Sequence, residues 1–372
     1  MNVRFSIGGL VALFFSSLLW SLNLLLFLYT LLLYSLLYWL PTEHWTANLL
    51  LLTMPVAWFF NLAFLVFWFF TEHALRSVLS GLVLLMGMPF WPRTFSLNDP
   101  EQPGPNQPTF SLLSYNVMRF DAGDHWELHR PSVRARHLTS WVVRHDAPVK
   151  CFQEFYNSPE TIFNTLDRLD EAGYTHRALL HPELADRPDA YIGVAILSRY
   201  PIVKQGRSVF SEFNGMVWAD IKFGVDTIRV INVHMQSMGI RVGNVLDQEE
   251  MVGVRQETRG ILGALRHGFV ERRQQVRQVE DVMAGSPHPV ILTGDFNDTP
   301  YSTVYERLRR QLRNAFEDRG RGLGFTLNRS PSFIRIDNQF YDAHYLHVLD
   351  FQTLDHVIYS DHFPICGNYV LK

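Results

Sequence analysis

The chain has 372 residues, two cysteines and a formal net charge of −3 at neutral pH. This balance gives no general attraction to nucleic acid, which usually requires a basic domain or stripe. The two thiols, Cys151 and Cys366, cannot form a disulfide framework and are too few for a cysteine-rich zinc site. The charge is also unevenly placed, because the acids and strong bases of residues 1–95 are Arg4, Glu43, Glu72, Arg76 and Arg93.

Three apolar runs fill this N-terminal part, at residues 10–40, 47–70 and 74–91. A helix needs about 20 apolar residues to cross a bilayer, and the first two runs reach that length. The third is shorter and has Arg76 near its start. A cleaved signal peptide has an apolar core of about 7–15 residues, shorter than the first run. We therefore predict that residues 1–95 form three transmembrane helices rather than two.

The arginines that flank these runs predict an orientation. With three spans, Arg4 and Arg76 lie on one side of the membrane and Arg93 on the other. Because positive charge favours the cytoplasmic side, the N-terminus is expected in the cytoplasm and the C-terminal part outside it. Residues 96–108 follow as a linker, since Asn98–Pro108 combines prolines and a glycine with no apolar residue.

Residues 109–372 are predicted to form one α/β domain. Short apolar runs bounded by turn residues indicate strands, at Phe110–Tyr115, Val149–Phe152, Gly193–Leu197, Met216–Ile221, Thr227–Val233, Val290–Thr293, His356–Tyr359 and Gly367–Leu371. Helical patterns lie between them, at Ser132–Arg144, Ser158–Ala172, Ser302–Arg313 and in part of Gln248–Ala284. Several strands are apolar on both faces, which indicates burial against another layer. Two packed sheets with outer helices would give a four-layer α/β/β/α sandwich.

Polar residues stand where several of these strands end. Asn116 interrupts LLSYNV, Glu154 lies in CFQEF, and His234 lies in INVHMQS. Further along, VILTGDFNDTP carries Asp295 and Asn297 in a turn, IRIDN carries Asp337, and VIYSDHFP carries Asp361 and His362. Carboxylate and amide oxygens on several strand ends suit a hard cation such as Mg²⁺ better than zinc. With two histidines, this set suits phosphoester hydrolysis assisted by a metal and a positioned base.

The motifs SYNV, QE, VHMQS, GDFND, RID and SDHFP, in this order and spacing, resemble the endonuclease/exonuclease/phosphatase (deoxyribonuclease-I-like) superfamily. The segment Gly193–Pro201, GVAILSRYP, is similar to a further strand of that family. The resemblance extends from about Ser111 to the C-terminus and implies the four-layer sandwich. A multi-span N-terminus before this domain resembles membrane-bound bacterial members, which implies a bacterial inner-membrane protein. With the orientation expected from the arginines, the catalytic domain would be periplasmic.

The resemblance also implies a role for each motif residue. Asn116 and Glu154 would hold the metal, Mg²⁺ or alternatively Mn²⁺, with Asp361 as a further ligand. His234 would contact the scissile phosphate. Asp295 would orient or deprotonate the attacking water and Asn297 would fix the water or the phosphate. His362 would act as general base or phosphate stabiliser, oriented by Asp337, and the sequence leaves open whether Asp295 or His362 is the base.

Three functions remain open at this point. The first is hydrolysis of a phosphodiester in nucleic acid. The second is hydrolysis of a phospholipid head group or an inositol phosphate, as in sphingomyelinases, which the membrane anchor favours. The third is an inactive scaffold tethered to the membrane, against which the complete motif set argues. The expected partners are the phosphoester substrate and the lipid bilayer, and no protein partner is predicted.

Overall fold

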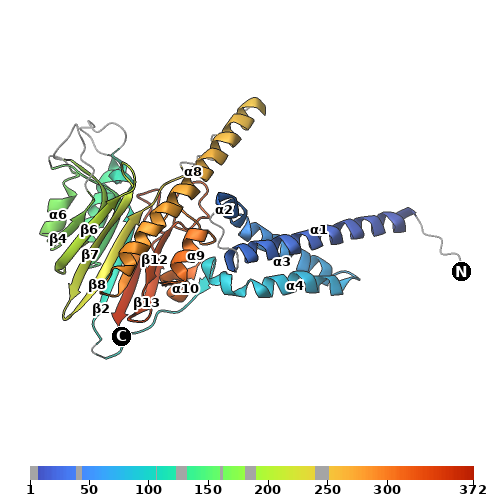
Figure 1. Ribbon diagram of the computed structural model, residues 1–372, viewed down its shortest axis with the longest axis horizontal. Helices are drawn as coiled ribbons and strands as arrows, with labels where there is room; N and C mark the ends of the chain where they lie inside the picture. Colours follow the sequence, from blue (N-terminus) through green and yellow to red (C-terminus); the bar gives the residue numbers. More distant parts are fainter. Residues whose placement is uncertain are drawn as a thin grey trace. The chain divides into compact units, whose positions relative to one another are not determined.

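The computed structural model of the protein (Figure 1) describes residues 7–38, 44–105, 107–122, 132–159, 162–180, 190–238 and 251–372. The chain divides into two compact units. The first comprises Met1–Pro92 and Tyr301–Thr303, and the second comprises Arg93–Pro300 and Val304–Lys372. The segment Ser237–Arg255 follows the His234 motif, and its position alone suggests a loop that determines substrate specificity. Part of this segment lies outside the described residues.

The first unit is helical, with α1 (Ile7–Tyr38), α2 (Trp45–Leu51), α3 (Met54–Phe69) and α4 (Ser77–Met86), and with 3₁₀ turns at Ala74–Arg76 and Met88–Arg93. Two stretches, Leu10–Tyr38 and Trp45–Phe69, are long and apolar enough to cross a membrane. The apolar helix within the third expected span, Ala74–Met86, is shorter than these two, so that span stays a prediction.

Buried polar side chains join the helices of this unit in pairs. Asn23 Nδ2 of α1 donates to Ser80 Oγ of α4 at 2.8 Å. Asn61 Nδ2 of α3 donates to Thr30 Oγ1 of α1 at 2.9 Å. Because the surroundings are apolar, each pair satisfies groups that would otherwise be costly to bury, and each fixes how two helices face each other.

The second unit contains two six-stranded sheets. The first has the order β13 (Leu346–Thr353), β14 (Ile365–Leu371), β2 (Thr109–Asn116), β3 (Val149–Asn157), β5 (Tyr191–Ser198) and β4 (His176–Leu179). The second has the order β10 (Arg313–Asn314), β12 (Asp337–Tyr341), β9 (Val290–Asp295), β8 (Asp226–His234), β7 (Gly215–Phe223) and β6 (Ile202–Val209). One pair in each sheet is parallel, β2 with β3 and β8 with β9.

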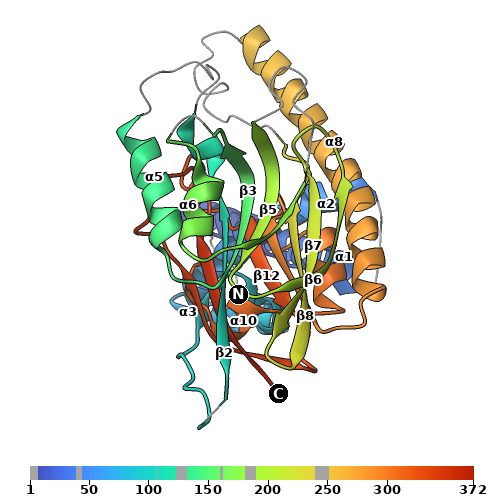
Figure 2. The ribbon, with the colours of Figure 1, turned by 90° about the vertical axis from the view of Figure 1, so that its left-hand side faces the viewer.

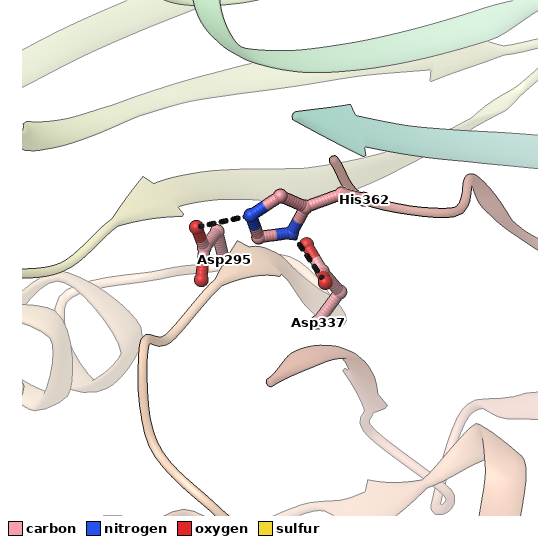
Figure 3. Close-up of side chains that lie close together, drawn as sticks. All are labelled: Asp295, Asp337 and His362. Atoms are coloured by element: carbon pink, nitrogen blue, oxygen red, sulfur yellow. Dashed lines mark hydrogen bonds and ion pairs between the residues drawn. The ribbon is translucent and has the colours of Figure 1, made fainter. Parts of the chain in front are cut away.

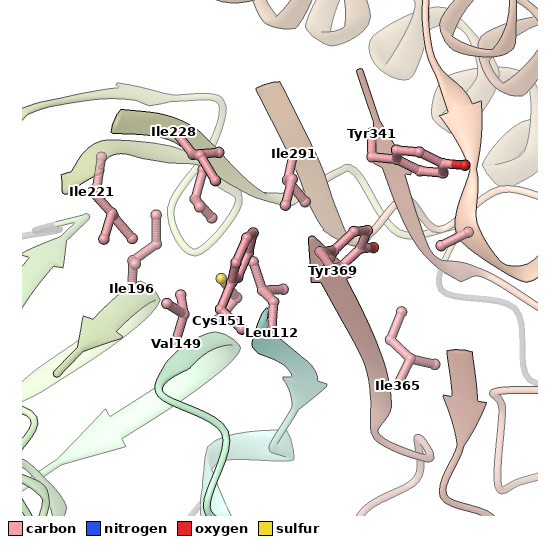
Figure 4. Packing of buried hydrophobic residues seen from close by; sticks show 14 of the residues in the cluster. Leu112, Val149, Cys151, Ile196, Ile221, Ile228, Ile291, Tyr341, Ile365 and Tyr369 are labelled. Carbon is pink, nitrogen blue, oxygen red and sulfur yellow. The ribbon is translucent and has the colours of Figure 1, made fainter. Parts of the chain in front are cut away.

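Three apolar cores separate four layers. The central core lies between the sheets and includes Leu112, Ile196, Ile228, Ile291 and Tyr369 (Figure 4). A second core lies between the first sheet and helices α5 (Val133–Arg144) and α6 (Thr165–Glu171), and a third packs α8 (Met251–Ala284) and α9 (Thr303–Arg309) on the second sheet. Figure 2 shows α5 and α6 on one side of the strands and α8 on the other. The predicted α/β/β/α sandwich is confirmed.

The structure differs from the strands predicted from the sequence at two segments. The predicted strand His356–Tyr359 is wrong, because this segment forms a turn and loop between β13 and β14. By contrast, β12 was not predicted because Asn338 and Gln339 make it look polar. Both side chains are buried, and Gln339 Nε2 donates to the main-chain oxygen of Leu112 at 3.0 Å, which explains how a central strand accommodates them.

The second unit also includes residues that the sequence suggested as linker. Ser96–Leu97 form β1, which pairs antiparallel with β11 (Arg321–Gly322). Just before it, Arg93 is buried, and its Nη2 lies 2.6 Å from Glu306 Oε2. The compact unit that carries the predicted site residues therefore begins at Arg93, ahead of the expected boundary at residue 109.

Candidate active site

The predicted site residues are delivered by strand ends from both sheets. Within the parallel pairs, Asn116 is in register with Gln153, and His234 with Asp295. Parallel neighbours end at the same edge of a sheet, so each pair brings its polar residues together. The two sheets face each other across the central core, which places both edges around one centre.

Glu154 reaches this centre through a β-bulge. The register of β3 against β5 shifts between Phe152 and Phe155, and Glu154 has a φ of +50°. A bulge inserts a residue that re-aims its side chain, and a non-glycine residue at positive φ is held there by its surroundings. Asn297 has a φ of +49° in the turn after β9. Backbone strain thus occurs at two residues that the motifs single out.

The Asp295 carboxylate is the centre of the arrangement. Its Oδ1 accepts a hydrogen bond from the main-chain nitrogen of Asn297 at 2.8 Å. Four side-chain nitrogens surround its Oδ2: Asn116 Nδ2 at 3.1 Å, Asn297 Nδ2 at 3.3 Å, His234 Nε2 at 3.7 Å and His362 Nε2 at 3.8 Å. Residues from four separate motifs, SYNV, VHMQS, GDFND and SDHFP, therefore meet at one carboxylate.

His362 is held by Asp337 on the side away from Asp295 (Figure 3). His362 Nδ1 lies 2.9 Å from Asp337 Oδ2, and both residues are buried. Burial acts to lower the pKa of His362, but the Asp337 and Asp295 carboxylates outweigh it and raise the pKa to about 10. Burial also raises the pKa of Asp337, and the charge of His362 acts in the opposite direction. This contact is the structural basis for the prediction that Asp337 orients the His362 imidazole.

The predicted metal ligands lie in two places. Asn116 Nδ2 is 3.4 Å from Glu154 Oε1, and the Asn116 Oδ1 accepts a hydrogen bond from Met118 N at 3.0 Å. Asp361 instead has its Oδ2 3.3 Å from Arg329 Nε. The structure therefore brings Glu154 and Asn116 together, and pairs the Asp361 carboxylate with an arginine.

Two buried atoms at the centre have no hydrogen-bond partner among the described residues, His234 Nδ1 and Asp337 Oδ1. The Glu154 carboxylate is partly exposed, with 29% of its side chain accessible. Another possible ligand group consists of Asp295, Asp337 and His362, whose ligand atoms all lie within 4.8 Å of one another. Because the imidazole already bonds Asp337, this group suits an ion pair better than a cation. Glu154 shares His234 as a neighbour with Asp295, and its contacts are long, at 3.4 Å from Oε1 to Asn116 Nδ2 and 4.0 Å from Oε2 to Arg119 Nε. This partly exposed carboxylate therefore fits a hard cation.

The site depends on two further contacts that the motifs did not reveal. Asp298, the last residue of GDFND, has its Oδ2 3.2 Å from Arg272 Nε, and both side chains are buried. Arg272 Nη1 also donates to the main-chain oxygen of Gln236 at 2.9 Å. This arginine on α8 therefore fixes the loops that follow β8 and β9. Its position near the middle of a long helix gave no sequence signal.

Thr326 supports the Asp337 side of the centre. Its Oγ1 accepts hydrogen bonds from the main-chain nitrogens of Ile336 at 3.0 Å and Asp337 at 3.1 Å. On the opposite side, Ser360 Oγ donates to the main-chain oxygen of Asn116 at 2.7 Å and accepts from His362 N at 3.3 Å. These two hydroxyls fix the strand ends that carry the carboxylate and the imidazole.

A four-layer sandwich with a carboxylate, two imidazoles and two amides at the meeting strand ends defines a class of fold that serves phosphoester hydrolysis. The chain belongs to the Endonuclease/Exonuclease/phosphatase family, whose sequence model matches residues 113–362. The N-terminal part, residues 16–94, matches a separate model described as a domain of unknown function. No curated protein matches the chain.

Solved structures of the same fold are similar to this chain. A family protein from Bacteroides thetaiotaomicron is 19% identical with a TM-score of 0.50, covering 72% of this chain and 100% of its own. The family protein from Beutenbergia cavernae is 16% identical with a TM-score of 0.48, covering 71% and 72% respectively. The human Nocturnin catalytic domain is 16% identical with a TM-score of 0.47, covering 71% and 94%. At these identities the likeness concerns the fold.

Proposed function

We propose that the second unit is a metal-dependent phosphodiesterase of nuclease type, anchored to a membrane by the helices of the first unit. The observation that carries this proposal is the convergence of Asn116, His234, Asn297 and His362 on Oδ2 of Asp295. A carboxylate surrounded by imidazole and amide donors can hold a water molecule while the donors bind phosphate oxygens. This is the arrangement that in-line hydrolysis of a phosphodiester needs.

Each residue has a distinct role in this proposal. Asp295 orients the attacking water and accepts its proton, and Asn297 fixes the water. His234 and His362 present their Nε2 atoms toward Asp295 and bind the phosphate oxygens as negative charge develops. Asp337 keeps Nδ1 of His362 engaged, which fixes the ring. This geometry supports Asp295 as the base and His362 as the phosphate stabiliser.

Glu154 would hold the divalent cation, Mg²⁺ or Mn²⁺, with Asn116 and Asp361 as the further ligands expected from the motifs. When bound, the cation supplies polarisation of the phosphoryl oxygen and stabilises the leaving oxygen. In the structure the Asn116 amide nitrogen faces Glu154, and Asp361 pairs with Arg329. Glu154 is thus the ligand with the best geometric support.

The anchor and its sidedness belong to the same proposal. Two helical stretches of the first unit are long and apolar enough to cross a membrane, by length and composition. With the third span included, the arginine distribution favours the periplasmic side of a bacterial inner membrane for the catalytic unit. Reporter fusions at the C-terminus test this, since a periplasmic reporter should be active and a cytoplasmic one inactive.

The test of hydrolysis uses the full-length protein in detergent micelles with bis(p-nitrophenyl) phosphate and Mg²⁺. We expect excess chelator to abolish turnover. Asp295→Ala and His362→Ala should each lower kcat by about 100-fold or more, and the double variant should be no worse than the stronger single one. The matched control is the double variant Asp281→Ala, His267→Ala, which changes two exposed residues of α8. Full activity in chelator or in the Asp295→Ala, His362→Ala protein would exclude the proposal.

A second candidate is hydrolysis of a phospholipid head group or inositol phosphate, which the two long apolar helices favour. The same centre would carry the reaction. Offering plasmid DNA, RNA, sphingomyelin and phosphoinositides to the micellar protein separates the candidates by product release. Inactivity on every substrate, with the fold intact, would favour the scaffold alternative.

A further inference from the structure

A groove lies along the outer face of α5, and its volume is about 530 Å³. Its walls combine cationic and planar aromatic side chains with one serine, and no carboxylate lines it: Arg136, His137, Ser140, Trp141, Arg144, His145 and Tyr359. Trp141 and Tyr359 also pack against the core beneath α5, whereas the proposed hydrolysis uses none of these side chains.

The groove follows from the helical repeat of α5. Arg136, Ser140 and Arg144 are spaced by four residues, and so are His137, Trp141 and His145. Residues four apart lie on the same face of a helix, so these form two adjacent stripes, one cationic and one aromatic. The opposite face of the helix is the buried one. Trp141 and His145 are half-buried, and the Trp141 ring contacts Tyr115 with centroids 5.6 Å apart. The two arginines are exposed, so core packing does not account for the cationic stripe.

The two arginines of the groove are exposed and carry unbalanced charge. Among the described residues, neither Arg136 nor Arg144 forms an ion pair with a carboxylate. Arg199, Arg307 and Arg313 elsewhere on the unit each pair with one, respectively Asp146, Glu280 and Asp318. A guanidinium without a carboxylate partner, beside a cavity, is free to bind a phosphate group in bidentate fashion.

Tyr359 links the groove to the catalytic loop. Its ring stacks on His137 with centroids 5.5 Å apart and an interplanar angle of 11°. Its main-chain oxygen accepts a hydrogen bond from Arg134 Nε at 2.8 Å. The next residue, Ser360, bonds the main chain of Asn116, and His362 follows shortly after. One short segment thus forms a wall of the groove and carries a predicted catalytic residue.

We infer that this groove binds a single strand of nucleic acid, with phosphates on Arg136 and Arg144 and a base against the aromatic stripe. Arginines beside planar rings match a backbone that alternates phosphates with planar bases. A lipid head group offers phosphate without a planar surface, so it matches the two arginines but not the aromatic rings beside them. The inference rests on the proposed function in one respect, namely that the bound strand is the phosphodiester substrate. On that basis, the groove assigns nucleic acid as the substrate class.

Binding is measured by fluorescence anisotropy of a short fluorescein-labelled oligothymidylate, with the full-length protein in detergent micelles and excess chelator. We expect Arg136→Glu with Arg144→Glu to raise Kd by about tenfold or more, and to reduce the steepness of its salt dependence by about 1.4 in log–log slope, for two phosphates. The matched control is Arg177→Glu with Arg207→Glu, which makes the same charge change at exposed positions on β4 and β6. Its Kd should stay close to that of the wild-type protein.

The contribution of the bases is tested with an abasic oligomer of the same length. It should bind the wild-type protein about fivefold or more weakly than oligothymidylate, the lower bound for one stacked base. His137→Ala removes an exposed ring and should bring the Kd values of the abasic oligomer and of oligothymidylate closer together. Equal Kd values for the groove and control variants, equal binding of both oligomers, or no binding by the wild-type protein would overturn the inference. Binding in chelator, with no hydrolysis of the same oligomer once excess Mg²⁺ is supplied, would retain the groove and reject the proposed function instead.

Discussion

Gln153 and Asn232 connect the two sheets directly, because Gln153 Nε2 donates a hydrogen bond to Asn232 Oδ1 at 2.6 Å. Gln153 precedes Glu154 in β3, and Asn232 lies two residues before His234 in β8. Both amides are buried. This side-chain hydrogen bond thus links β3, which carries the proposed metal ligand Glu154, to β8, which carries the proposed phosphate-binding residue His234.

Asn232 also supports the bulge of β3, and its replacement is the first prediction. Its Nδ2 donates to the main-chain oxygens of Phe152 at 3.0 Å and Ala195 at 2.9 Å. We expect Asn232→Leu to lower the free energy of unfolding by about 2–4 kcal/mol, because three buried polar partners lose their hydrogen bond. Turnover by the folded fraction should fall too, since Glu154 is no longer fixed. Denaturant unfolding and kcat on the same preparation measure both effects.

The control for this change is Asn368→Leu, which replaces a half-exposed asparagine on β14. A change confined to about 0.5 kcal/mol is expected there, as for substitutions away from buried networks. Equal destabilisation in both variants would show that the bridge between the sheets is not special.

The second prediction concerns the pairing of Asp337 with His362. Asp337→Asn keeps the size of the side chain but removes the charge 2.9 Å from His362 Nδ1. We expect kcat to fall by about 100-fold or more, with little change in KM, because the imidazole acts on charge that develops in the transition state. The assay uses bis(p-nitrophenyl) phosphate.

Asp342→Asn, in the turn after β12, serves as the comparison. It should retain the activity of the wild-type protein. If Asp337→Asn kept a normal kcat, the pairing would be structural and His362 would not need its partner.

The place of the site was predictable because its residues follow buried strands in the sequence. Asp295 and Asn297 stand directly after the apolar run Val290–Thr293, and His234 follows Thr227–Val233. Such residues must emerge at a sheet edge whatever the sheet order is. The convergence on Asp295 could not be predicted, because it depends on how the two sheets face each other.

The supporting contacts were hidden for a related reason. Asn232 lies within a strand, where a buried amide has no pattern that distinguishes it from a polar surface position. Arg272 joins Asp298 across a large sequence separation. Likewise, β6 alternates exposed and half-buried residues at a sheet edge, and β12 carries Asn338 and Gln339. Their strand character comes from pairing partners rather than from their own apolar pattern.

The third prediction concerns Arg93, at the start of the second unit. Its Nη2 lies 2.6 Å from Glu306 Oε2, and its main-chain oxygen accepts a hydrogen bond from Arg335 Nη2 at 2.6 Å. We expect Arg93→Ala to destabilise the unit by about 2 kcal/mol, because a buried guanidinium and its hydrogen bonds are lost, although the half-buried Glu306 keeps Arg310 as a partner. Arg321→Ala removes an exposed pair with Asp99 and should cost at most about 1 kcal/mol.

A truncation provides an independent measure of this boundary. A fragment of residues 93–372 keeps β1 and Arg93, whereas one of residues 109–372 loses both. The longer fragment should unfold at a higher denaturant concentration. If the two unfolded together, residues 93–108 would act as a linker, as the sequence alone suggests.

The fourth prediction is a pH dependence that comes from Lys150. This lysine is fully buried in β3, where Nζ donates to the main-chain oxygens of Val142 at 2.6 Å and Val143 at 3.3 Å. Burial lowers its pKa from 10.5 to about 7, and the charge of Arg199 acts in the same direction. Between these two pH values the unfolded chain holds a proton that the folded chain has released.

The contribution of Lys150 to stability must therefore rise with pH across this window, since for this group the unfolded state binds more protons. Below pH 7 the charged amine is buried and its full cost applies, and above pH 10.5 neither state carries the charge. We expect the free energy of unfolding to increase by about 1 kcal/mol per pH unit from this group. Lys150→Met removes the titration, so the difference between the two slopes, measured by denaturant unfolding at several pH values, isolates its contribution. Equal slopes would mean that the amine stays protonated in the folded protein, held by the two carbonyl oxygens at the end of α5.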